Sequence, residues 1–62
     1  MDVHLEATVN GKKVYYLRVG KNNQVIMTDN KENSQPLQKH LVPGIITKLL
    51  NQYEEVKDVA IE

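Results

Sequence analysis

The residues best suited to a chemical role lie in one basic segment that runs from Lys12 to Lys21. This segment carries four basic side chains, two tyrosines and no acidic residue. Sheet surfaces that bind single-stranded nucleic acids place aromatic rings, on which bases stack, beside basic side chains that contact phosphates. The candidate nucleic-acid contacts, with Tyr15 as the stacking residue, are Lys12, Lys13, Arg18 and Lys21.

Two features count against nucleic-acid binding. Tyr15 and Tyr16 are adjacent, so they point to opposite faces of a strand, whereas a stacking platform needs its rings on one face. Eight Lys and Arg also balance eight Asp and Glu, so the net charge of zero gives no general attraction to nucleic acid or to an anionic membrane. Nucleic-acid binding is therefore the alternative function, and solvent-exposed lysines on a two-sided strand are the simpler interpretation.

No set of side chains has the spacing of a metal site or a catalytic site. The chain has no cysteine, and its two histidines, His4 and His40, do not form a His-x-x-x-His ligand pair. The stretch 29–33 differs from a calcium-binding loop, because Lys31 stands at a ligand position and no glycine follows. The one serine, Ser34, lies outside any Gly-x-Ser-x-Gly motif. We expect no catalytic residue, no cofactor and no metal, and a protein that is not an enzyme.

A chain of 62 residues predicts one small domain with a marginal core. Such a domain buries only about 60% of the surface that its unfolded chain exposes. Small domains usually add disulfides, a metal or an oligomeric partner, and here a partner is the remaining choice. Asp2, His4 and Glu6 interrupt the N-terminal apolar residues, which a signal peptide would not tolerate. No apolar run is long enough for a membrane span, so we expect a cytoplasmic protein.

The N-terminal half has the pattern of an antiparallel sheet. Apolar and polar residues alternate from Val3 to Val9, and Asn10-Gly11 is the strongest short signal for a hairpin turn. A β-rich run at 12–19, a turn at 20–23 and a third run at 24–28 complete a predicted three-stranded meander over residues 2–28. The predicted register pairs Val9 with Lys12, Ala7 with Val14, Leu5 with Tyr16 and Val3 with Arg18.

The C-terminal half is predicted to be mainly helical. A polar loop at 29–35 precedes a helical region at 36–57, in which residues 36–41 make one or two turns. Pro43 suits a first helical turn, and the apolar spacing that follows predicts an amphipathic helix from Gly44 to Lys57. The tail 58–62 fits a short fourth strand, which its β-branched residues favour, or more helix. Residues 1–62 thus form one α+β domain.

Both faces of the predicted sheet carry apolar residues. The richer face, which we expect the helix to cover, holds Val3, Leu5, Ala7, Val9, Val14, Tyr16, Val25 and Met27. The other face, here called the second face, holds Tyr15, Leu17, Val19 and Ile26 beside His4, Glu6, Lys13 and Thr28. An apolar patch of this kind on so small a domain indicates an interface, so we expect a homodimer through this face or a strand edge, or a host protein as partner. Alternatively, residues 36–41 or the tail cover the second face, or its apolar residues are exposed without a functional role.

A loose motif gives a resemblance to known proteins. The run Tyr16-Leu17-Arg18-Val19, then 24–33 with its Met-Thr-Asp step, and then an amphipathic helix resembles small hairpin-plus-helix proteins of Gram-positive bacteria and their phages. The resemblance covers about residues 14–53, and Pro36 and Pro43 stand where those proteins often have an aromatic anchor. Since most such proteins have no known activity, the resemblance implies a phage or prophage setting and no mechanism.

Overall fold

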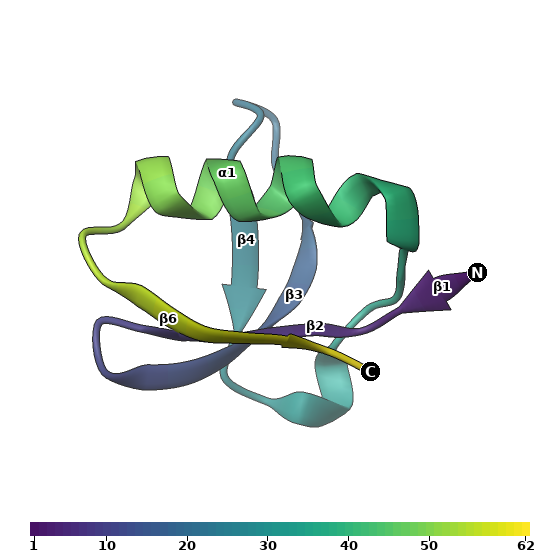
Figure 1. Cartoon of the computed structure of the whole chain (residues 1–62), viewed down its shortest axis with the longest axis horizontal. Helices are drawn as coiled ribbons and strands as arrows, with labels where there is room; N and C mark the ends of the chain where they lie inside the picture. Colours follow the sequence, from purple (N-terminus) through teal and green to yellow (C-terminus); the bar gives the residue numbers. More distant parts are fainter.

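The computed structural model describes all residues, 1–62, and confirms the α+β class. One helix, α1 (Val42–Gln52), crosses one face of a four-stranded antiparallel sheet with strand order β4-β3-β2-β6 (Figure 1). The sheet strands are β2 (Leu5–Val9), β3 (Lys12–Val19), β4 (Val25–Thr28) and β6 (Val56–Ile61). A separate two-stranded ribbon pairs β1 (Asp2–Val3) with β5 (Leu37–Gln38). The predicted meander is therefore present, within a larger sheet.

The first hairpin forms at the predicted turn. Asn10 and Gly11 have φ values of 51° and 84°, the positive values that a two-residue hairpin loop requires. The ladder pairs Val9 with Lys12 as predicted, but it ends where Glu6 lies opposite Tyr15. Beyond that point the chain bends away, and Val3 pairs with Leu37 of β5 instead of with β3. The predicted pairs at the open end of this hairpin are therefore wrong.

The second hairpin contains an irregularity in β3 that the sequence did not signal. Tyr16 lies opposite Met27, but Arg18 lies opposite Ile26 and Val19 opposite Val25, so Leu17 is an extra residue. Because side chains alternate between faces, one inserted residue exchanges the faces of those beyond it. Val19 therefore lies on the helix-covered face with Val25, and Arg18 lies on the second face with Ile26. The predicted regular register placed Val19 on the second face and Arg18 on the face of Val3, so both placements correct the prediction.

The helix is shorter than predicted and begins earlier. It starts at Val42 with Pro43 in its first turn, as that residue suggested, and ends at Gln52 instead of Lys57. Tyr53 is extended, with φ −128° and ψ 147°. Tyr53 and Val56 still pack against the core, but from a non-helical backbone. The region 36–41 is likewise not helical throughout, since β5 precedes a 3-10 turn at Lys39–Leu41.

The tail is a strand, which was the favoured alternative. β6 lies beside β2, with Leu5 opposite Ile61 and Thr8 opposite Lys57 (Figure 1). The register shifts between these pairs, and Asp58 has a φ of 54° at the shift. Aspartate enters this left-handed region more readily than most residues, so it can form a bulge where glycine is common.

The core lies between α1, the sheet and the small ribbon. Its buried cluster consists of Val3, Leu5, Val25, Leu37, Val42, Ile45 and Leu49, and Ala7 and Val9 are also buried. The alternating residues of the first strand thus face the helix as predicted. The one α-helix has 11 residues, which is too short to span a membrane.

Candidate functional site

The predicted interface residues do not form one open apolar patch. Tyr15, Leu17 and Ile26 are half-buried. Val19 is 37% exposed, but the irregularity in β3 places it on the helix side of the sheet. The prediction that these four residues share the second face is therefore wrong for Val19, because it assumed regular alternation along β3. That Tyr15, Leu17 and Ile26 carry a protein contact stays a prediction.

Part of the second face is occupied by the polar loop, a segment that the prediction did not consider as a cover. The Ser34 hydroxyl lies 3.0 Å from His4 Nδ1, and the Gln35 amide donates a hydrogen bond of 3.0 Å to the Tyr16 carbonyl. A 3-10 turn at Lys31–Asn33, capped by the Asn30 side chain, brings this segment to β3. These contacts tie the loop to the sheet over Tyr15.

The hollow between the loop and the sheet is small. It has a volume of about 180 Å³ and is lined by His4, Leu5, Glu6, Tyr15, Lys31, Ser34 and Glu62. Pockets for small molecules usually measure about 300–1,000 Å³. The lining includes both basic and acidic side chains, so it favours neither an anionic nor a cationic ligand. No group of three or more His, Asp or Glu side chains anywhere in the chain could hold a metal ion.

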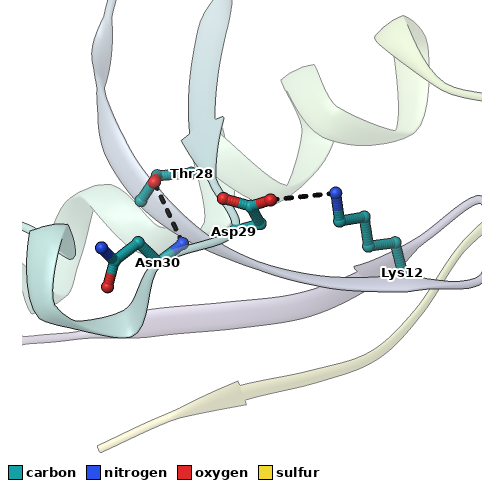
Figure 2. Close-up of polar contacts among 4 residues, drawn as sticks. All are labelled: Lys12, Thr28, Asp29 and Asn30. Carbon is teal, nitrogen blue, oxygen red and sulfur yellow. Dashed lines mark hydrogen bonds and ion pairs between the residues drawn. The ribbon is translucent and has the colours of Figure 1, made fainter.

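The basic residues of β3 and of the turn that follows it are dispersed and partly neutralised. Lys12 Nζ lies 2.9 Å from a carboxylate oxygen of Asp29 (Figure 2), and Lys13 Nζ lies 3.5 Å from one of Glu6. Lys12 donates a hydrogen bond to Asp29, and this bond and its charge lower the pKa of that carboxyl. Arg18 and Lys21 are exposed and form no ion pair. The four candidate nucleic-acid contacts therefore do not form one basic surface.

The free edge of β4 has a distinctive polar contact. The Gln52 side chain, from the last residue of α1, accepts a 2.6 Å hydrogen bond from the Val25 amide and donates one of 3.0 Å to the Val25 carbonyl. An amide that both donates and accepts in this way imitates one residue of a neighbouring strand. The contact shows that the main-chain groups of Val25 point away from β3 toward the open edge.

A hollow of about 400 Å³ lies along the same edge. It is lined by Gln24, Val25, Ile26, Met27, Gln52 and Tyr53. None of these side chains is charged, and no strand lies on this side of β4. The edge therefore offers main-chain hydrogen-bonding groups beside uncharged side chains, which is the chemistry that an added strand needs.

The opposite edge of the sheet is β6, which exposes apolar side chains but also carries a bulge and acidic residues. Val59 and Ile61 are 36% and 41% exposed, and the Asp58 bulge interrupts the strand between them and the start of β6. Bulges and charged side chains are common devices that hinder pairing at a sheet edge. Glu62 adds a second carboxylate just beyond β6.

Sequence reasoning missed Gln52, although a signal was present. Gln52 follows Ile45 and Leu49 at intervals of four and three along one helix face, and both of those residues are buried. A polar residue on the apolar stripe of a helix needs a hydrogen-bond partner when the helix packs. The partner itself, 27 positions away on β4, could not be identified from the spacing.

Comparisons with known proteins place the chain in no family: no protein-family model, no curated protein and no solved structure matches it.

Proposed function

We propose that this chain is a non-catalytic protein-interaction module that associates reversibly with a second copy of itself by strand pairing. The observation that carries the proposal is the sheet order, in which β4 and β6 are edges with no further strand beside them. A strand edge presents main-chain groups that pair readily with another strand. A strand edge therefore replaces the second face, whose apolar residues are half-buried, as the proposed surface of association.

The non-catalytic part of the proposal is supported by the chemistry of the two hollows. The smaller one contains the His4–Ser34 contact, which is exposed and ties the polar loop to the sheet. The larger one is lined only by uncharged side chains. In neither hollow do a nucleophile, a general base and a group that orients the base form a hydrogen-bonded chain, as acyl-transfer chemistry requires.

The size of a strand edge sets the expected strength of association. Stable protein interfaces bury about 1,200–2,000 Å² in total, and weak or transient ones bury less. An edge strand such as β4, with four residues, or β6, with six, covers only a small part of that area. We therefore expect a dimer that forms and dissociates with protein concentration.

The test is the solution mass by light scattering or sedimentation across a wide range of concentrations. We expect the mass to rise from 7.1 kDa toward twice that value as the concentration increases. A mass that stays at 7.1 kDa at the highest concentration would contradict self-association. Leu17→Lys, on the interior strand β3, is the control and should leave the concentration dependence unchanged.

A further inference from the structure

We infer that the associating edge is β4, which pairs antiparallel with β4 of a second copy so that Ile26 lies opposite Ile26 of that copy, and that the Gln52 side chain competes for the same edge. This inference rests on the proposed self-association and names its surface and its regulation.

The main chain of β4 is self-complementary in this register. The Val25 N–H and C=O point to the open edge, because Gln52 binds both of them. β4 pairs with β3 through four consecutive residues without an insertion of its own, so alternation holds along it and the Met27 groups point the same way. A two-fold axis at Ile26 brings Val25 of each copy opposite Met27 of the other. Both outward-pointing residues then form hydrogen-bonded pairs.

The side chains of β4 also suit self-pairing. The central pair joins two isoleucines, and the outer pairs join Gln24 to Thr28, so no charged side chain faces another across the new ladder. Aliphatic cross-strand pairs stabilise a sheet, whereas like charges directly opposite destabilise it. The free edge of β4 is therefore compatible with a second copy of itself.

β6 is less suited to the same arrangement. Glu62 exchanges two hydrogen bonds of 3.0 Å with His4, so its main chain points toward β2, and the groups of Ile61 point to the open edge. An antiparallel β6 pair centred on Ala60 would bring Asp58 of one copy opposite Glu62 of the other. The two carboxylates would repel each other, and the bulge at Asp58 would distort the ladder further.

The Gln52 side chain blocks the β4 edge. We call its contact with the Val25 main chain the latch. Its amide occupies the Val25 groups that a second strand must bind, so the intramolecular contact and the dimer exclude each other at this residue. The hollow beside it, about 400 Å³ and lined by Ile26, Met27 and Tyr53 among others, provides space for the incoming strand. Removing the Gln52 amide should therefore strengthen self-association.

A charge-swap experiment tests the register directly. Ile26→Lys and Ile26→Glu should each be monomeric, because each places like charges in the central pair. An equimolar mixture of the two variants should form a heterodimer, because lysine then faces glutamate. Circular dichroism of each variant alone checks that it is folded. Met27→Pro provides a second route, since it removes an outward-pointing N–H without removing a hydrogen bond to β3.

The latch is tested with Gln52→Ala against Asn51→Ala, which changes the exposed neighbour on α1. Loss of one or two competing hydrogen bonds of ordinary strength should tighten self-association by about tenfold in Gln52→Ala. Asn51→Ala should associate like the natural chain. Equal association constants for Gln52→Ala and the natural chain would overturn the latch.

The outcomes separate the inference from the proposed function. If the natural chain dimerises but both Ile26 variants and Met27→Pro also dimerise, the β4 inference is wrong while self-association stands, and Val59→Lys would then locate the contact on β6. If the natural chain is monomeric but Gln52→Ala dimerises through Ile26, the β4 edge and its latch are supported while the proposed function fails. If neither associates, both are wrong.

Discussion

Lys12, the first residue of β3, and Asp29, the residue after β4, are joined by an ion pair with 2.9 Å between Nζ and Oδ2 (Figure 2). The two residues stand at adjacent ends of strands that are neighbours in the sheet. Beside them the Asn30 amide donates a 3.2 Å hydrogen bond to the Thr28 hydroxyl, which shapes the exit from β4 (Figure 2). The ion pair thus links the start of the second hairpin to the start of the polar loop.

The first prediction concerns the titration of Asp29. The hydrogen bond and charge of Lys12 lower the folded-state pKa of Asp29. The contribution to stability is therefore present above the ordinary aspartate pKa and is lost as the pH falls through the lower folded value. Lys12→Ala should raise the Asp29 pKa toward its ordinary value in an NMR titration. Lys21→Ala is the control, and an equal change in both variants would argue against the ion pair.

The second prediction compares two adjacent leucines of α1. Leu49 is 0% exposed in the core, whereas Leu50 is 56% exposed. Leu49→Ala should lower the free energy of unfolding by about 2–5 kcal/mol because it removes buried methylene contacts and leaves a cavity. A domain of this length has roughly 3–9 kcal/mol in total, so this variant should lose a large part of its stability. Urea denaturation should show a much smaller loss in Leu50→Ala.

The third prediction compares two glycines with open space around the position of an added Cβ. Gly11 has a φ of 84° and Gly44 lies in α1 without a positive φ. Gly11→Ala should destabilise the protein by about 1–2 kcal/mol, because an L-residue is strained in the left-handed region. Gly44→Ala should stabilise it by up to about 1 kcal/mol, because alanine is the better helix former. Thermal unfolding should shift in opposite directions, and shifts of the same sign would contradict the assigned backbone conformations.

The fourth prediction concerns the Val25 amide. At concentrations where the protein is monomeric, this amide should exchange its hydrogen slowly for an edge position, since Gln52 accepts its hydrogen bond at 2.6 Å. Gln52→Ala should accelerate its exchange while the amides of β2, which has a strand on each side, stay unchanged. Fast exchange of Val25 in the natural chain would show that the latch is open most of the time.

The parts of the fold that depend on local chemistry could be predicted from the sequence. Asn10-Gly11 fixed the first turn because few residue pairs accept two positive φ values. The alternation from Val3 to Val9 identified the core face, since a strand with one buried face needs a period of two. Pro43 marked the first helical turn for an equally local reason.

The parts that depend on tertiary contacts could not be predicted. Leu17 is chemically like its neighbours, so nothing in the sequence marks it as the extra residue of β3. Tyr53 and Val56 keep a spacing that fits a helix, yet the turn toward β6 makes them extended. The Val25–Gln52 contact depends on where α1 ends over the sheet. The candidate site at the β4 edge could therefore not be predicted without knowing where α1 ends.

The pairing of β2 with β6 has a mechanical consequence. Two main-chain hydrogen bonds join His4 to Glu62, and β2 and β6 run antiparallel away from this point. A force that pulled the two chain ends apart would first load the short β1–β5 ribbon and then the hydrogen bonds of the β2–β6 ladder one pair at a time, beginning at His4. Such an unzipping geometry resists force less than shearing a whole ladder at once, so the sheet should open under a small load from this corner.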